Sequence, residues 1–311
     1  MYSLLQKKPT VQTDPYPHVI IEEALPWDLY EELEKTWPKD QIINTIPYDK
    51  GVCYRLKSGT LINPTFQPDV WRKFAEYHTS AKWFMEVYEL FKPWLSHPKV
   101  TDLLPNLEEN VCARGWRGFK EVKEIVLTSS GRKKRVRNPK NILTDCQVVM
   151  HNPSLEIQTT RTPHIDNPLE MFAGLLYMPY KNDTSTGGNF QIHSTKNNIT
   201  KVRMAGGKIG GKDFHALGHV PTKGGREIYP EDVGPVHTTI PYKRNTFVMF
   251  CNMSPNTVHS VSKRINPTMY RRSVNIIAEF RKKFKNIYHK MYEVEEIDMF
   301  SKNNKAIKRD R

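Results

Sequence analysis

Short runs of β-branched and aromatic residues, separated by Gly, Pro and Asn, fill the chain from about residue 142 to about residue 280. Such runs are typical of β-strands. They predict strands at residues 146–150, 172–178, 189–193, 246–251, 258–262 and 273–280. Because no helical periodicity lies between them, the pattern favours a sandwich or jelly roll over a parallel α/β fold.

The first 140 residues have a mixed pattern. A strand is expected at residues 18–21, and a helix from about residue 25 to about residue 37. Apolar residues then recur in steps of three and four from about residue 69 to residue 95, which predicts one longer helix. The predicted fold class is therefore α+β, with a helical N-terminal layer packed on a β core.

We expect one compact domain with three parts. Residues 1–143 form the supporting helices and strand, residues 144–280 form the β core, and residues 281–311 form a basic, helical C-terminal tail. The segment at about 194–238 interrupts the strand spacing with several glycine pairs. A segment this long with weak periodicity is either a functional lid or a disordered insertion, and we favour the lid.

The net charge of +14 comes from 47 basic and 33 acidic residues, and its location decides what it means. Arg132–Arg137 holds five positive residues, and the tail holds ten positive and five negative ones. These two segments account for most of the charge, so the rest of the chain is almost balanced. They are candidates for a weak contact with an anionic partner such as nucleic acid, and no basic groove through the fold is expected.

The cellular location follows from what the chain lacks. No apolar run is long enough to span a membrane, and the opening residues have no signal-peptide core. The four cysteines are scattered, without a C-x-x-C pair. We therefore expect a cytoplasmic protein with reduced thiols and no membrane contact.

Three short segments of the sequence contain the candidate chemical residues. His164 and Asp166 are two residues apart, so in extended backbone their side chains share one side. His259 follows a predicted strand, and Arg271 and Arg272 open the last one. Two imidazoles and one carboxylate form the facial triad of non-haem Fe(II) oxygenases, which leaves coordination positions open for a 2-oxoacid and dioxygen. An arginine fork suits the second carboxylate of such a cosubstrate.

Here the chain resembles the Fe(II)/2-oxoglutarate-dependent dioxygenases, in particular their prolyl-4-hydroxylase-like branch. The resemblance covers residues 146–280 and rests on four motifs, which are His164-Ile165-Asp166, Leu176-Tyr177-Met178-Pro179, Thr186-Gly187-Gly188-Asn189-Phe190, and His259 with Arg271-x-Ser273. It implies a double-stranded β-helix, a jelly roll that holds the metal inside its open end. It also implies a hydroxylase that uses dioxygen and converts 2-oxoglutarate to succinate and CO2.

The same resemblance assigns roles to residues. His164, Asp166 and His259 would bind Fe(II), and Arg271 would bind the far carboxylate of 2-oxoglutarate with help from Tyr177 and Ser273. Side chains alternate along a strand, so only one of Arg271 and Arg272 points inward, and the R-x-S spacing favours Arg271. The presence of Asp166 favours hydroxylation over halogenation, because related halogenases have Ala or Gly there.

Two other classes of function stay open at this point. A jelly roll with a basic surface is also suited to a non-catalytic binding protein for an anionic partner such as nucleic acid. Zinc-dependent hydrolysis is disfavoured, since no general base lies near the motif. The remaining histidines and Trp116 are expected to be packed or solvated residues. The expected substrate is a small molecule or a peptidyl group.

Overall fold

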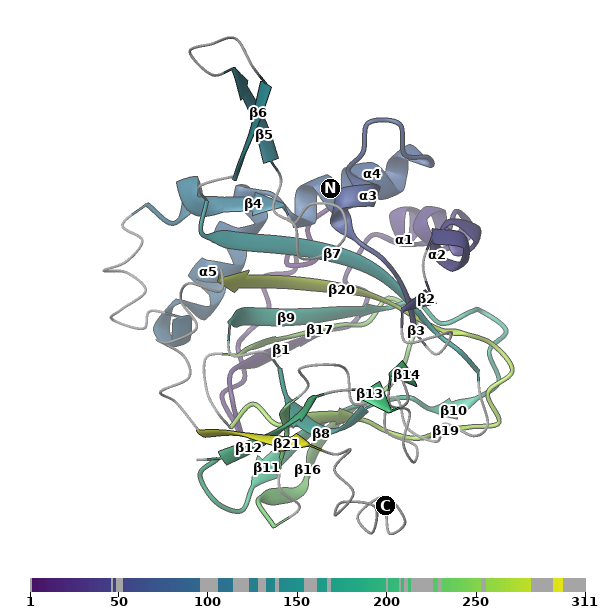
Figure 1. The fold of residues 1–311 in the computed structure, drawn as a ribbon. Helices are drawn as coiled ribbons and strands as arrows, with labels where there is room; N and C mark the ends of the chain where they lie inside the picture. Colours follow the sequence, from purple (N-terminus) through teal and green to yellow (C-terminus); the bar gives the residue numbers. More distant parts are fainter. Residues whose placement is uncertain are drawn as a thin grey trace.

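A computed structural model gives the structure of the chain. It describes residues 2–45, 47–48, 53–95, 106–113, 123–127, 133–137, 140–153, 161–166, 169–199, 201–206, 208–209, 212–213, 226–228, 231–252, 256–280 and 293–298. Helices lie on one face of a large sheet, and a second sheet lies on the other face of the large one (Figure 1). The α+β class is confirmed, with an antiparallel β core.

The N-terminal layer contains strand β1 (His18–Ile21) and most of the helices. These are α1 (Trp27–Lys35), α2 (Lys39–Thr45), α3 (Ser58–Leu61), α4 (Asp69–His78) and α5 (Ala81–Leu95), followed by the 3-10 helix η2 (Glu108–Asn110). The single helix predicted for residues 69–95 is wrong, because α4 ends at His78 and α5 begins at Ala81, with Thr79 and Ser80 between them. The Thr79 hydroxyl donates to the Ala75 carbonyl, and the Ser80 hydroxyl accepts from the Trp83 amide as an N-cap.

The large sheet has the order β1-β17-β9-β20-β7-β3-β2, and β4 (Val111–Ala113) also pairs with β7. Its central strands are β7 (Ile142–His151), β9 (Glu170–Tyr177), β17 (Phe247–Cys251) and β20 (Arg271–Phe280), and β2 (Pro47–Tyr48) and β3 (Cys53–Leu56) extend it. The β20–β7 and β20–β9 pairs are long and antiparallel. The predicted strands 146–150, 172–178, 246–251 and 273–280 all fall in this sheet.

The second sheet has the order β16-β11-β18-β8-β15-β12-β21. Its first four strands are β16 (Val233–Ile240), β11 (Phe190–Thr195), β18 (His259–Val261) and β8 (Arg161–Ile165). From β7 to β20 the chain passes back and forth between the two sheets, so that each sheet holds strands from both halves of the core. This interleaving is the topology of a double-stranded β-helix, and the predicted jelly roll is confirmed.

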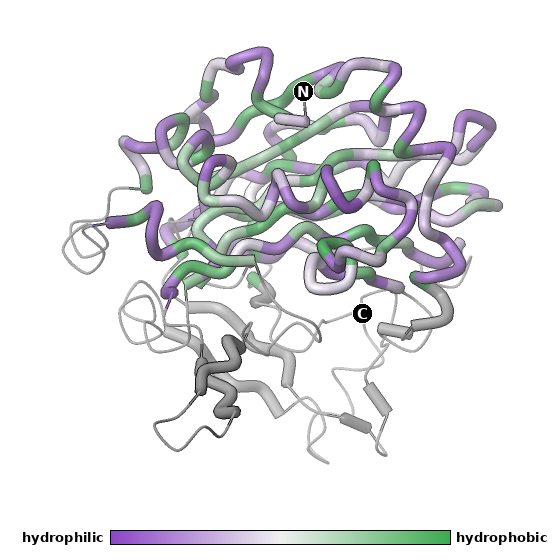
Figure 2. Tube along the Cα trace, turned by 90° about the horizontal axis from the view of Figure 1, so that it is seen from above, coloured by the Kyte–Doolittle hydropathy of each residue, from purple (hydrophilic) through white to green (hydrophobic). Residues whose placement is uncertain are grey.

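Side-chain alternation divides the large sheet into two faces. One face, the outer face, packs Val148, Met150, Val274 and Ile276 against the helices in the main core cluster. The opposite face, the inner face, packs Tyr177 and Phe250 against Phe190 of the second sheet. Apolar residues therefore run through the strands in the middle of the molecule, and polar residues gather at the turns (Figure 2). The inner face is where the candidate site lies.

The described parts of the 194–238 segment are mostly strands. β12 (Lys201–Gly206) and β15 (Arg226–Glu227) extend the second sheet beside β8, and β13 (Lys208–Ile209) pairs with β14 (Lys212–Asp213). The segment overlaps the end of β11 and the start of β16. Whether it acts as a lid stays a prediction, as do the proposed boundaries at residues 143 and 280.

Two basic segments contain strands. Within the tail 281–311, the described residues Glu293–Asp298 form strand β21, parallel to β12, so a helix is wrong for that stretch. The segment Arg132–Arg137 contains β6 (Lys133–Arg137), which pairs with β5 (Lys123–Leu127) in a hairpin that projects from the body (Figure 1). Among the described residues, no helix is both long enough and apolar enough to cross a bilayer.

Candidate metal centre

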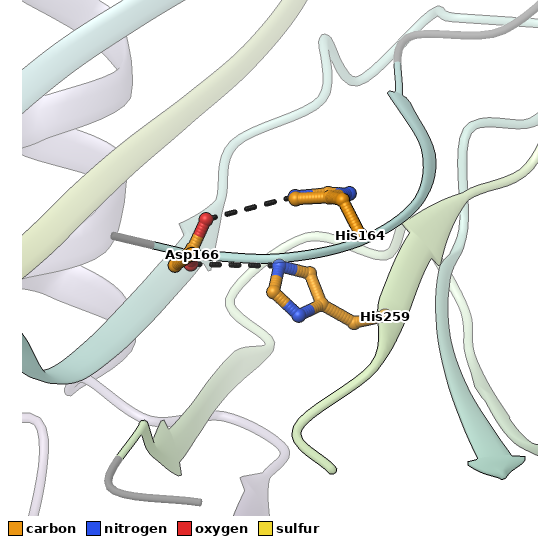
Figure 3. A group of neighbouring side chains, drawn as sticks. All are labelled: His164, Asp166 and His259. Atoms are coloured by element: carbon orange, nitrogen blue, oxygen red, sulfur yellow. Dashed lines mark ion pairs between the residues drawn. The ribbon is translucent and has the colours of Figure 1, made fainter. Parts of the chain in front are cut away.

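Adjacent strands of the second sheet bring the three predicted metal ligands together. His164 in β8 lies directly opposite His259, the first residue of β18, in the antiparallel register. Asp166 lies just beyond the end of β8, two residues after His164, and its carboxylate is on the same side (Figure 3). Residues 95 positions apart in the chain, His164 and His259, thus become neighbours through one hydrogen-bonded strand pair.

The three side chains converge on one point. Asp166 Oδ1 lies 3.6 Å from His164 Nε2, and Asp166 Oδ2 lies 3.5 Å from His259 Nε2 (Figure 3). One donor atom from each residue lies within 4.8 Å of the others. The two imidazole side chains are 4% and 6% exposed and the Asp166 side chain 19%, so the group is open mainly on the carboxylate side.

Packing and hydrogen bonding orient the His259 ring. Its Nδ1 lies 3.0 Å from the Thr257 carbonyl, which selects the tautomer that donates from Nδ1 and leaves the Nε2 lone pair toward Asp166. The ring stacks on Phe190 at 5.2 Å and lies 4.6 Å from Phe250 between centroids. These contacts hold the ring in a position to donate to a metal.

The charge of the group also suits a cation. Burial raises the pKa of the Asp166 carboxyl, but His259 and His164 outweigh burial and hold that pKa well below its usual range. Asp166 is therefore an anion at neutral pH. Two imidazole nitrogens and one carboxylate on one side of a point match the donor set that binds Fe(II) and leaves further coordination positions open.

Arg271 lies inside the same barrel, with its side chain only 2% exposed. Its Nε donates to the Gly188 carbonyl at 3.1 Å, and its guanidinium carbon lies 5.1 Å from the Tyr177 ring centre and 4.8 Å from that of Tyr242. Its buried Nη2 has no hydrogen-bond partner, and no described carboxylate lies within ion-pair distance. A buried cation in this state is suited to binding an anion from outside the protein.

Tyr177 presents a second buried polar atom without a partner, its hydroxyl oxygen. Burial raises the pKa of Tyr177 to about 12, although Arg271 opposes the shift. The phenol therefore stays protonated at neutral pH and can donate a hydrogen bond. Together, the Tyr177 hydroxyl and Arg271 Nη2 fit a carboxylate ligand.

Ser273 lies opposite Tyr177 in the register, on the same face of β20 as Arg271. Its hydroxyl donates to Asn275 Oδ1 at 3.1 Å, and the side chain is buried. Its position is thus next to the arginine and tyrosine, but its described hydrogen bond is made to the strand's own neighbour.

Two tyrosines of the site were missed by sequence reasoning. The Tyr242 hydroxyl accepts from the Arg272 amide at 2.6 Å and donates to the Arg272 carbonyl at 3.1 Å, while its ring covers the Arg271 guanidinium. The Tyr16 hydroxyl donates to the Val258 carbonyl at 3.2 Å, next to His259. Both hydroxyls bond main-chain atoms, which every residue has, so these contacts leave no pattern in the sequence.

Other histidines lie away from the triad. His193 points to the other side of the second sheet, where its Nε2 bonds the Ser260 hydroxyl at 2.8 Å. His237 pairs with Asp14 at 3.1 Å on the surface. His215, His219 and Trp116 lie outside the described residues.

Comparison with known proteins gives matches among solved structures. No protein-family model matches the chain, and no curated protein matches it. The structure is similar to a prolyl-4-hydroxylase from Pseudomonas putida, with 11% identity and a TM-score of 0.38, over 85% of this chain and 92% of that one. It is also similar to a rice dioxygenase for auxin oxidation, with 9% identity and a TM-score of 0.36, over 85% and 72% of the two chains.

Proposed function

We propose that this protein is an Fe(II)- and 2-oxoglutarate-dependent oxygenase that hydroxylates its substrate. One observation carries the proposal: a His164–Asp166–His259 donor group and a buried, unpaired Arg271 line the same barrel. A metal site alone has many uses, and an unpaired arginine alone has others. The combination suits a metal-bound ligand that also carries a distant carboxylate, which describes 2-oxoglutarate.

Each residue has a distinct task in this proposal. His164, Asp166 and His259 hold the metal, and the Thr257 carbonyl keeps His259 in the donating tautomer. Arg271 binds the far carboxylate of 2-oxoglutarate through its free Nη2, and the protonated Tyr177 hydroxyl donates to the same group. Bound Fe(II) with dioxygen would supply the oxidising power for C–H hydroxylation, coupled to conversion of 2-oxoglutarate to succinate and CO2.

The walls of the barrel support this chemistry by excluding water. Phe250 on the inner face and Phe190 of the second sheet are buried and lie against the His259 ring, and Val248 belongs to the same apolar cluster. In such surroundings the Arg271 charge interacts more strongly with a bound carboxylate than it would in water. The apolar wall therefore strengthens cosubstrate binding and protects the reaction from bulk solvent.

Anaerobic reconstitution tests the proposal. Adding Fe(II) and then 2-oxoglutarate to the purified protein should give a weak visible absorption band from the chelated cosubstrate, and Arg271→Gln should lose it at the same 2-oxoglutarate concentration. Admitting dioxygen should then release succinate. A protein that binds no stoichiometric iron and consumes no 2-oxoglutarate would be the non-catalytic binding protein instead, and zinc retention with hydrolysis would indicate the third class.

The substrate and partners belong to the proposal as well. The prolyl-4-hydroxylase-like motifs point to a peptidyl or small-molecule substrate. We also propose a weak nucleic-acid contact through Arg132–Arg137, which includes the projecting β6, and through the basic tail. Binding to duplex DNA or RNA should then weaken steeply as salt rises. Binding that is absent at low salt would remove this contact and leave the oxygenase proposal standing.

A further inference from the structure

A second buried arginine lies beside the proposed cosubstrate anchor. Arg264, in β19 (Arg264–Ile265), has a side chain only 5% exposed, as buried as that of Arg271. Both side chains contact the same residue, Gly188. Two buried cations this close repel each other, so the protein needs a way to compensate one of them.

Arg264 is compensated where Arg271 is not. Its Nη2 lies 3.0 Å from Asp183 Oδ2 and 2.7 Å from the Ser185 hydroxyl, and the Asp183 side chain is only 4% exposed. Asp183 Oδ1 in turn accepts from the Ser185 amide at 3.0 Å and from its hydroxyl at 2.6 Å. Both carboxylate oxygens of Asp183 therefore have hydrogen-bond partners, in Ser185 and in Arg264. It neutralises Arg264 and leaves the charge of Arg271 available.

Arg264 also holds both chain segments that fix the place of Arg271. Its Nη1 donates to the Met269 carbonyl at 2.8 Å, two residues before Arg271. Its aliphatic stem lies against Gly188, whose carbonyl accepts from Arg271 Nε at 3.1 Å. A Cβ at residue 188 would lie 3.0 Å from Arg264 Cγ and 3.5 Å from Arg271 Nε. Both arginine side chains thus contact Gly188, and its φ of +71° favours glycine.

The electrostatic balance agrees with this geometry. Burial lowers the pKa of Arg264, the Asp183 carboxylate raises it, and the nearby charge of Arg271 lowers it. Loss of Asp183 would leave two uncompensated cations around one glycine. One of the two guanidinium groups would then turn toward solvent, and the Arg271 guanidinium would lose its fixed orientation.

We propose that the Asp183–Arg264 ion pair is a positioning device that aims Arg271 and so sets the affinity for the far carboxylate of the cosubstrate. The inference rests on the proposed oxygenase function. Asp183 and Arg264 touch no reacting atom in it. They act through Gly188 and Met269, the two points that bracket Arg271.

Titration of the Fe(II)-loaded protein with 2-oxoglutarate, without oxygen, tests the inference. Asp183→Asn should raise the dissociation constant of 2-oxoglutarate about tenfold or more, because a misdirected fork loses one charge-assisted hydrogen bond. Iron stoichiometry should not change. Saturating 2-oxoglutarate should restore most of the turnover, so that KM rises while kcat is largely kept. A purely structural pair would lower stability without this separation.

A matched control is available on the other side of the sheet. Glu34 is 17% exposed and pairs with Arg244 at 2.5 Å and with Arg272 at 3.5 Å, so Glu34→Gln also disrupts partly buried arginine pairs. It should lower stability and leave 2-oxoglutarate affinity unchanged. Wild-type affinity in a folded Asp183→Asn protein would overturn the inference, and so would an equal loss of affinity in Glu34→Gln.

A milder variant covers the case in which Asp183→Asn does not fold. Arg264→Lys keeps the charge but cannot reach Asp183 and the Met269 carbonyl together, since it lacks the fork. It should weaken 2-oxoglutarate binding severalfold, and unchanged affinity in the folded variant would overturn the inference. If the wild-type protein itself binds iron but no 2-oxoglutarate, the proposed function fails first, which is a different result.

Discussion

Arg271 and Arg272 are consecutive in β20, and their side chains lie on opposite faces of the large sheet. The Arg271 Nε donates to Gly188 on the inner face, where Tyr177 and Tyr242 flank the guanidinium. The Arg272 Nε donates to the Met178 carbonyl at 2.8 Å, and its guanidinium lies over Tyr180 and Trp37 near helix α1. Arg271 therefore faces the candidate site, and Arg272 contacts the helical layer.

This arrangement predicts different losses for the two arginines. Arg271→Gln should weaken 2-oxoglutarate binding by about a hundredfold or more and leave iron binding intact, because two charge-assisted hydrogen bonds are lost. Arg272→Gln should instead lower the free energy of unfolding by about 1–3 kcal/mol, with 2-oxoglutarate affinity unchanged. Isothermal titration and urea unfolding measure the two quantities. Equal effects of both variants on 2-oxoglutarate binding would contradict the assignment.

Metal binding should depend on His259 and not on His193, although both are buried histidines in adjacent strands of one sheet. Changing an outer-shell partner of a metal ligand typically costs 10–100-fold in affinity, so His259→Ala, which removes a ligand, should cost more than about a hundredfold. His193→Ala loses the bond to Ser260 and should reduce stability alone. Anaerobic Fe(II) or Co(II) titration separates the two, and full iron occupancy in His259→Ala would rule out the triad.

Two tyrosines from the N-terminal layer should affect different halves of the site. Tyr16 donates to the Val258 carbonyl beside His259, and Tyr30 donates to the Tyr177 carbonyl, each at 3.2 Å. Tyr16→Phe should lower metal affinity about fivefold, and Tyr30→Phe should lower 2-oxoglutarate affinity by a similar factor, since each loses about 1 kcal/mol of hydrogen bonding. The reverse pattern, or no change in either affinity, would show that these bonds serve stability alone.

The stability of the protein should fall between pH 6.5 and pH 3 because of His78. This residue is fully buried at the end of α4 among Phe74, Tyr77 and Trp83, and burial lowers its pKa to about 3. The unfolded chain takes up a proton near pH 6.5, whereas the folded protein does not. The free energy of unfolding should therefore drop by about 1.4 kcal/mol for each pH unit in this window.

His78→Gln provides the comparison, because glutamine keeps an N–H donor for the Phe74 carbonyl but does not titrate. Between pH 7 and pH 5, urea unfolding should show about 2 kcal/mol less pH dependence for the variant than for the wild type. Both proteins share every other titrating group, so the difference reports His78. Identical slopes would mean that the imidazole can be protonated within the fold.

The sequence was sufficient to predict the order of the site residues and most of the core strands. His164 and Asp166 were predicted from their two-residue spacing, and His259 and Arg271 from the neighbouring strands rich in β-branched and aromatic residues. Two core strands were missed. β8 contains Pro163, and β16 contains Gly234 and Pro235, which lower strand propensity. β16 tolerates its proline as the edge strand of its sheet, and the β8–β18 pairing shifts register between His259 and Val261.

Other features depend on contacts that no local pattern encodes. The break at Thr79 and Ser80 is one, because the apolar periodicity continues across it while two hydroxyls cap the helix ends. The roles of Tyr16 and Tyr242 are another, since both hydroxyls bind distant main-chain atoms. The Asp183–Arg264 pair joins residues 81 positions apart. Each required the register of the sheets, which is a property of the whole fold.

The direct opposition of His164 and His259 in β8 and β18 has a consequence for how the family of such chains can diversify. The two ligand strands are fastened to each other by main-chain hydrogen bonds, independently of the polypeptide that connects them. The connecting stretch includes the core strands β9, β11, β16 and β17, so only the segment between β11 and β16 can lengthen, shorten or be exchanged without altering the spacing of the ligands. New recognition elements can therefore be added in that segment while His164 and His259 keep their positions.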